Sequence, residues 1–428
     1  MLISFFFVAP VMEWYGRKPA HVLIVIPNIL TCVVYYYASN VTTLVLARMV
    51  HGLSCGGAIA LSPIIVAEFT SPKLRGILLN LKTSFGALGV MLAHTLGLFF
   101  DWRKTILVGM TMPAFALLIT FTWPETPAWL ASRGHNERCA SAFYWLRGKG
   151  ARSQKELRAL IKAETDRRNT RVISGDRTFL LKAKGFFIQC VKKDFRKLVM
   201  LLLCIFIFLE ASGRYFFPLY AIKIINAFTN GQSSIYYVVI LDGVILLSTI
   251  LACVLIQRYQ RRTLLFSTGA VCIALLLTTC LYLLLKSKGI IHRDYAWIPL
   301  SLFGLYFILL NLGALPILMV VLGEIFPLKY RSAGVTMSAI ILSITLIITL
   351  LVTPTMMKVL DIHGSFTVHS FCMIGALLYL FYNLPETKGR TLQEIEERFT
   401  KGRQKVRLAD DGEDDGDDAT NAISIELR

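Results

Sequence analysis

Charged residues are scarce in this chain. They make up 17% of its 428 residues, whereas 55% are hydrophobic and the mean hydropathy is +0.60. Soluble domains average about 45–50% apolar and about 25% charged residues. The apolar residues also come in blocks of about twenty, the length of a helix that crosses a bilayer. The shortage of charge therefore excludes an ordinary soluble domain and indicates a protein embedded in the lipid bilayer.

Several other patterns are also missing. The apolar blocks do not alternate with polar residues as the strands of a membrane barrel do, so the expected class is all-α. The nine cysteines show no CxxC pairing, which argues against a disulfide framework or a metal site. No catalytic triad or nucleotide loop is present, and His51, His94 and His369 are scattered and best explained as structural. We therefore expect neither an enzyme nor a cofactor.

The net charge of +18 does not indicate a nucleic-acid partner, because the excess lies in the connections between apolar blocks. "EWYGRKP", "SPKLRG", the segment 125–197, "QRYQRRT", "PLKYRS" and "KGRTLQ" are basic. The connections "SNVTT", "FTNGQSS" and "DIHGS" are nearly free of lysine and arginine, whereas "KSKGIIHRD" is an exception and "DWRK" is a lesser one. The positive-inside rule places the basic set in the cytosol.

The apolar blocks predict about ten full-length membrane spans. A shorter run, "MLISFFFVAPVMEW", precedes them and is interpreted as the end of a helix that begins upstream. About eleven spans are thus expected here, and one more upstream would give about twelve. The ten lie near 21–38, 43–66, 77–100, 105–123, 198–222, 235–256, 263–285, 297–322, 335–357 and 366–384.

Four regions follow from this pattern. Residues 1–123 form a first helical half that lacks its first helix, and residues 198–388 form a second half of six helices. Between them, residues 124–197 form a cytosolic linker in which "NERCASAFYWLRG" and "SQKELRALIKAETDRR" are expected to be short amphipathic helices. Residues 389–428 form a cytosolic tail whose acidic stretch "DDGEDDGDD" is typical of disorder.

The two halves share repeated motifs in the same order. Glu68 and Arg75 have an E-x6-R spacing that recurs in Glu324 and Arg331. "EWYGRKPAHVL" matches "QRYQRRTLLF", and "WPETPAWL" matches "LPETKGRTL". The chain is therefore interpreted as two homologous bundles related by pseudo-symmetry. Internal repeats around a central site are a hallmark of secondary transporters.

Taken together, these motifs resemble those of the sugar porter family of the major facilitator superfamily. They are "YGRK", "ARMVHGLSCGGA…VAEFTSPKLRG", "PETPAWL", "GEIFPLKYRSAG" and "PETKGR". The likeness covers nearly the whole chain up to the acidic tail and is strongest to the insect trehalose and glucose transporters. It implies the major facilitator fold, built from two six-helix halves.

The resemblance implies a cytosolic gate made of ion pairs between the helices of each half. Such pairs suit alternating access because they form in one state and break in the other. The family's "D-R-x-G-R-R" motif keeps an acid in the first half and loses it in the second, where Gln257 takes that place, so the second latch is expected to be weaker. The residues implied are Glu13, Arg17, Glu68, Arg75, Arg261, Glu324 and Arg331.

The family's sugar-binding motifs are largely replaced at mid-membrane. "Q-L" falls at Thr83-Ser84, "Q-Q-x-S-G-x-N" at 209–215, and "G-P-x-P-W" at 315–319. The lost glutamines remove several hydrogen bonds, each worth about 0.5–1.5 kcal/mol, so ordinary hexose affinity should fall. The positions implied as substrate-binding are Lys82, Thr83, Leu209, Glu210, Tyr215, Pro316 and Met319.

Three ionisable side chains lie at membrane depth in this region. Charged residues inside a membrane are costly and usually functional, so a partner is expected for each. We predict that Glu210 pairs with Lys82 or Arg214 across the cavity. The alternative is that Lys82 and Arg214 face water near helix ends.

These observations favour a monomeric facilitative transporter of a small polar solute, a sugar such as trehalose or a hexose, in the plasma membrane. The expected partners are that solute and the lipid bilayer. Two alternatives remain open: a membrane sensor or degenerate paralogue that transports nothing, and a transporter of a solute other than a hexose.

Overall fold

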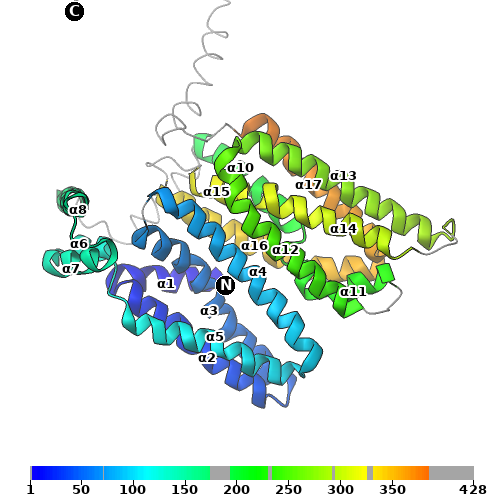
Figure 1. Ribbon diagram of the computed structural model, residues 1–428, viewed down its shortest axis with the longest axis horizontal. Helices are drawn as coiled ribbons and strands as arrows, with labels where there is room; N and C mark the ends of the chain where they lie inside the picture. Colours follow the sequence, from blue (N-terminus) through cyan, green and yellow to red (C-terminus); the bar gives the residue numbers. More distant parts are fainter. Residues whose placement is uncertain are drawn as a thin grey trace, which may run out of the picture.

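The computed structural model describes residues 2–70, 72–173, 193–229, 234–291, 295–324 and 331–384. Within these ranges it is helical, and nine helices are long and apolar enough to cross a membrane. Figure 1 shows two helical bundles side by side, with a small group of helices beside one end of the first. The predicted all-α architecture is confirmed.

The first bundle is built from α1 (Leu2–Trp14), α2 (Arg17–Tyr37), α3 (Val41–Phe69), α4 (Pro72–Phe99) and α5 (Trp102–Thr122). The connections between these helices are short, so neighbours in sequence lie antiparallel. At the start of α3, the Asn40 side chain accepts a hydrogen bond from the Thr43 backbone N–H at 2.8 Å. This N-cap satisfies one of the N–H groups that a helix start leaves unpaired.

The second bundle contains α10 (Lys193–Ala211), α11 (Phe216–Thr229), α12 (Ser234–Arg258), α13 (Arg261–Ser287), α14 (Trp297–Leu309), η1 (Leu310–Ala314), α15 (Leu315–Glu324), α16 (Arg331–Val359) and α17 (Asp361–Asn383). Its core is one continuous cluster of buried aliphatic and aromatic side chains. Phe303 stacks on Tyr306 and Phe366 and lies edge-on to Phe217, so aromatic packing joins α11, α14 and α17.

Nine of the ten predicted spans each correspond to one helical segment that is long and apolar enough to cross a membrane. For Trp297–Leu322, the observed ends are the predicted ones. The tenth predicted span, near 198–222, is divided between two helices. The chain turns at 212–215 between α10 and α11, and Gly213 has φ 88°, a backbone conformation that side chains with a Cβ rarely adopt. Pro218 follows within α11 and has no N–H to continue the helical ladder. We call residues 212–215 the α10–α11 break.

A second irregularity lies inside the span Trp297–Leu322. Residues 310–314 form the π-helical turn η1, which joins α14 to α15. Periodicity gave no sign of it, because an extra residue in one turn leaves the apolar character unchanged. π-Turns of this kind often occur at functional sites.

The linker forms a small helical unit of α6 (Pro127–Ser132), α7 (Asn136–Arg147) and α8 (Ala151–Ile173). Both predicted linker helices are confirmed as helices. Leu130, Cys139, Phe143 and Leu157 form their shared core. Glu156 on α8 forms ion pairs with Arg152 and Arg147. These guanidinium groups lower the pKa of its carboxyl, and the hydrogen bond from Arg152 has the largest effect.

The two halves meet chiefly through α4 and α12, which pack along each other (Figure 1). A smaller contact joins α1 to α16. Near one end of the α4–α12 junction, the Asn80 amide donates to the Thr249 backbone carbonyl at 3.1 Å. The halves are therefore joined chiefly by the α4–α12 pair, which includes a buried polar contact.

Candidate functional site

The best-defined polar network lies where α1, α2 and α3 meet the linker helix α6. The Arg17 guanidinium pairs with the Glu68 carboxylate at 2.5 Å and donates to the Met12 carbonyl at 3.0 Å. The side chains of Arg17 and Glu68 are only 18% and 16% exposed. One ion pair of the predicted gate is thus present, and it ties the start of α2 to the end of α3.

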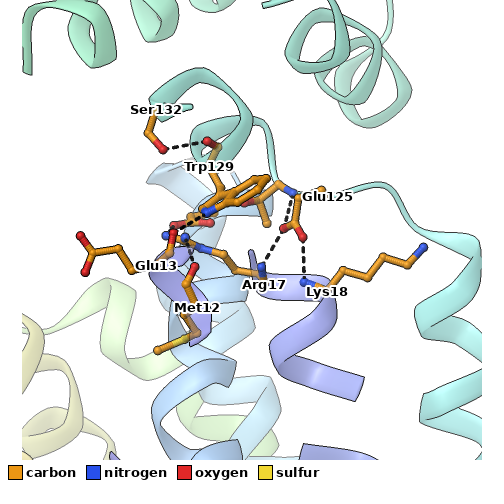
Figure 2. A network of polar contacts seen from close by, with 9 residues as sticks. Met12, Glu13, Arg17, Lys18, Glu125, Trp129 and Ser132 are labelled. Carbon is orange, nitrogen blue, oxygen red and sulfur yellow. Dashed lines mark hydrogen bonds and ion pairs between the residues drawn. The ribbon is translucent and has the colours of Figure 1, made fainter. Parts of the chain in front are cut away.

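Glu125 is the centre of this network, although its motif had suggested no role for it. Its carboxylate accepts hydrogen bonds from the backbone N–H groups of Arg17 (2.9 Å), Lys18 (3.0 Å) and Thr126 (2.9 Å). Figure 2 shows it lying over the first turn of α2. A carboxylate suits this place because the N–H groups at a helix start are unpaired and carry partial positive charge.

Gly16 lets the Glu125 carboxylate approach this closely. Its φ is 105°, and a Cβ added there would lie 2.4 Å from Glu125 Oε2. The "EWYGRK" and "PET" motifs are therefore two parts of one structure, in which a carboxylate caps a helix whose N-cap residue has no side chain. The repetition of "PET" in both halves was the signal that could have found Glu125.

The predicted gate residue Glu13 does not act through its carboxylate. Its side chain is exposed, and Figure 2 shows it directed away from Arg17. Its backbone carbonyl instead accepts hydrogen bonds from Trp129 Nε1 at 3.0 Å and from the Arg133 guanidinium at 2.6 Å. The residue contacts the linker, but any side chain would present the same carbonyl.

Of the other predicted gate residues, the structure describes the side chain of Arg261 alone. Arg261 begins α13 and is half-buried. The side chains of Arg75, Glu324 and Arg331 lie outside the part of the chain that the structure describes in detail. The second latch therefore stays a prediction.

Replacing Glu68 with glutamine should destabilise the first half. The change leaves the half-buried Arg17 guanidinium without its ionised partner, and hydrogen bonds to charged groups are worth about 1.5–3 kcal/mol. A lower thermal unfolding midpoint of the purified protein would show it. The matched control is Glu13→Gln, which should leave the midpoint unchanged because the Glu13 carboxylate has no partner in the described residues; equal effects of the two changes would contradict this account.

Glu210 is the most unusual polar residue of the membrane-embedded region. It lies one residue before the end of α10, is 2% exposed, and neither carboxylate oxygen has a hydrogen-bond partner among the described residues. Its predicted ion pair with Lys82 or Arg214 is not formed there. The α10–α11 break explains this for Arg214, whose guanidinium lies 5.3 Å from the centre of the Tyr215 ring instead.

The other predicted binding residues are spread around this point. The Lys82 side chain is exposed. Thr83 is half-buried, and its hydroxyl donates a hydrogen bond to the Leu79 carbonyl at 3.4 Å. Leu209 packs in the core of the second half, and Met319 lies partly buried against that core. Pro316 is buried in α15. These predicted positions thus lie on α4, α10 and α15, and among the described residues no hydrogen bond or ion pair joins their side chains.

Hydrogen bonds within the second half hold the α10–α11 break in place. The Tyr306 hydroxyl donates to the Ser212 carbonyl at 2.7 Å, and the Ser212 hydroxyl donates to the Leu209 carbonyl at 2.7 Å. A small pocket beside the break is lined by Ser212, Phe216, Phe307 and His369 among others, all from the second half. The break is therefore a supported structural feature and not an unfolded turn.

His94, interpreted from the sequence as structural, makes polar contacts with two helices of the second half. His94 on α4 lies 2.5 Å from the Asp242 carboxylate on α12, and its other ring nitrogen lies 3.1 Å from the Pro218 carbonyl. Sequence reasoning missed Asp242, although an acid within an apolar span is itself a signal. This contact bridges the two halves.

Comparison with known proteins identifies the family. Residues 1–399 match the family model described as "Sugar (and other) transporter". The chain is 30% identical over 402 residues to the facilitated trehalose transporter Tret1 of Bombyx mori, with 93% of this chain and 76% of that protein covered. It is 30% identical over 392 residues to the Tret1 of Drosophila mojavensis, of which it spans 44%.

Solved structures show the same fold at lower identity. An inward-open structure of the xylose transporter XylE from E. coli superposes with a TM-score of 0.71 at 19% identity, covering 92% of this chain and 86% of that one. The human organic anion transporter MFSD10 gives a TM-score of 0.52 at 16% identity, covering 87% and 79%. Because that family model spans residues 1–399, this chain belongs to the "Sugar (and other) transporter" family, and it shares the fold of XylE.

Proposed function

We propose that this protein carries a sugar, trehalose or a hexose, across a membrane by facilitative alternating access. Its family and the names of its relatives from Bombyx and Drosophila support this substrate class. The observation that carries the proposal is the α10–α11 break, because transporters form their substrate sites from discontinuous helices near the membrane centre.

The proposed substrate site lies between α4 and the end of α10. Lys82, Thr83 and Tyr215 would offer donors and acceptors to sugar hydroxyl groups, and Glu210 would accept hydrogen bonds through its buried carboxylate. Pro316 and Met319 would contribute an apolar wall, whereas Leu209 is buried in the core of the second half. A neutral polyol needs several such polar groups in an otherwise apolar cavity.

The proposed gate uses the network around Arg17 and Glu68. Glu68 and Arg75 would latch the first half, with Glu324 and Arg331 doing the same in the second half. The basic connections, the linker helices and the C-terminal tail would face the cytosol in a monomer at the plasma membrane. Ion pairs at a wet rim are weak enough to break in each cycle.

Exchange of labelled trehalose and labelled glucose across proteoliposomes that contain the purified protein tests this proposal. We expect saturable exchange of at least one of the two sugars. Glu210→Gln should reduce it by about tenfold or more, because a hydrogen bond to a charged group is worth about 1.5–3 kcal/mol. Unchanged exchange in that variant would remove Glu210 from the site.

The matched control is Glu137→Gln, the same substitution on the exposed surface of α7, which should exchange sugar like the unmodified protein. The competing candidate is a membrane sensor, which is favoured by the burial of Leu209 in the core of the second half. A folded protein that exchanges neither sugar would favour the sensor.

A further inference from the structure

The imidazole of His94 lies between two hydrogen-bond acceptors. Nδ1 is 2.5 Å from Asp242 Oδ2, and Nε2 is 3.1 Å from the Pro218 carbonyl oxygen. A backbone carbonyl only accepts, so Nε2 must carry a proton to bond with it. A second proton must lie between Nδ1 and the carboxylate, because two acceptors would repel each other at that distance.

A neutral histidine carries one N–H and an ionised aspartate carries no proton, so together they hold one proton. The observed contacts require two. Either Nδ1 is also protonated and donates to the carboxylate, or Asp242 is protonated and donates to Nδ1. Both arrangements contain two protons on the pair and no net charge. Loss of one proton leaves a neutral imidazole that satisfies only one of its two neighbours, together with an unneutralised carboxylate.

Loss of that proton is energetically costly because the pair lies in an apolar environment. The Asp242 side chain is 3% exposed and that of His94 is 20% exposed, inside apolar spans. An ionised carboxylate in such a place is costly unless it is paired. Among the described residues, neither member of the pair has a further ionic partner. The other ionisable side chains that the structure describes on α4, α11, α12 and α14 are Lys82, Tyr220, Lys223, Tyr236, Tyr237, Cys253, Arg258 and Tyr306.

The pair also joins three elements from both halves. His94 belongs to α4, Asp242 to α12, and Pro218 to the first turn of α11, just beyond the α10–α11 break. Tyr220 has non-helical dihedral angles (φ −118°, ψ 17°), which interrupts the hydrogen-bond ladder next to the Pro218 carbonyl. That carbonyl is therefore available to a partner from outside its helix.

We propose that His94 and Asp242 form a proton-binding site that fastens the start of α11 to the first half when it is occupied. Release of the proton breaks either the contact with Pro218 or the contact with Asp242. The start of α11 is then free to move relative to α4, so the exchange of conformations depends on pH. The proton comes from and returns to the aqueous phase.

The thermal unfolding midpoint of the purified full chain in lipid nanodiscs tests this without any substrate. It should fall by about 2–4 °C between about pH 5.5 and about pH 8.5, a range that brackets the ordinary titration of histidine. Binding of a proton to the folded protein stabilises it by mass action, so the stabilisation is lost as the pH rises.

Asp242→Asn is the informative variant. The asparagine amide donates to Nδ1 of a neutral His94, and Nε2–H still donates to Pro218, so both contacts form without the extra proton. Its midpoint should not change with pH over this range. His94→Gln should lower the midpoint at every pH and also abolish the dependence. The proposal would be overturned if the midpoint of Asp242→Asn depended on pH as that of the unmodified protein does. It would also be overturned if the midpoint of the unmodified protein did not depend on pH.

Asn80→Ala is the matched control, because it removes another polar contact between α4 and α12 that holds no titratable group. It should lower the midpoint while keeping the pH dependence. In proteoliposomes, trehalose exchange should vary with pH in the unmodified protein and not in Asp242→Asn. This second measurement rests on the proposed function, whereas the unfolding midpoints decide the proton site even if no sugar is exchanged.

Discussion

Replacing Glu125 with alanine is expected to lower the free energy of unfolding by about 2–4 kcal/mol. The carboxylate caps the start of α2 and also bonds to the Thr126 N–H, so its loss leaves three backbone donors without their acceptor. Loss of an N-cap costs about 0.5–2 kcal/mol, and bonds to a charged acceptor are worth more. Denaturation of the purified protein, followed by circular dichroism, measures the effect.

Glu125→Gln separates charge from shape. Glutamine keeps one acceptor oxygen but places an NH₂ group where the second oxygen met the Lys18 N–H at 3.0 Å. We expect it to be intermediate between alanine and the unmodified protein. An alanine variant as stable as the unmodified protein would show that the cap contributes nothing, in conflict with the space that Gly16 leaves for it.

Replacing Gly313 with alanine is expected to destabilise the second half by about 1–3 kcal/mol, the usual cost of overpacking. Gly313 lies in η1, and a Cβ there would meet Thr268 Oγ1 at 2.3 Å and Thr268 Cγ2 at 2.5 Å. Thr268 cannot easily withdraw, because its hydroxyl donates to the Leu264 carbonyl at 2.6 Å. The thermal unfolding midpoint of the purified protein should fall accordingly.

Two further variants test the cause of that effect. Gly304→Ala on α14 is the control, because a Cβ there meets only Leu241 Cδ1 at 4.0 Å; it should be neutral or slightly stabilising. Thr268→Ala combined with Gly313→Ala should recover part of the loss, since it removes the two nearest atoms. A double variant no more stable than Gly313→Ala alone would mean that the clash is not the cause.

Most of the helical architecture was predictable from the sequence. Apolar runs of about twenty residues are long enough to predict spans without knowing what they contact. The exceptions are the α10–α11 break and η1. Both depend on contacts from other helices: Tyr306 holds Ser212 at the break, and Thr268 fills the space beside Gly313 in η1.

The site was predictable only in part. Arg17 and Glu68 were recognised through their motifs, and the structure pairs them. Glu13 was assigned by the same motif and is directed elsewhere, whereas Glu125, far along the chain, caps α2. Sequence motifs identify residues that share a region, but the direction of a side chain depends on the packing of neighbouring helices.

By itself, the sequence determined that this is a duplicated helical membrane protein with repeated acid–base motifs. These properties are local, or repeat at a constant spacing, so they can be counted along the chain. Only the tertiary structure decided that Glu210 is buried without a hydrogen-bond partner among the described residues and that His94 meets Asp242 and Pro218. Such contacts join helices far apart in sequence, and they exist only once the two halves pack together.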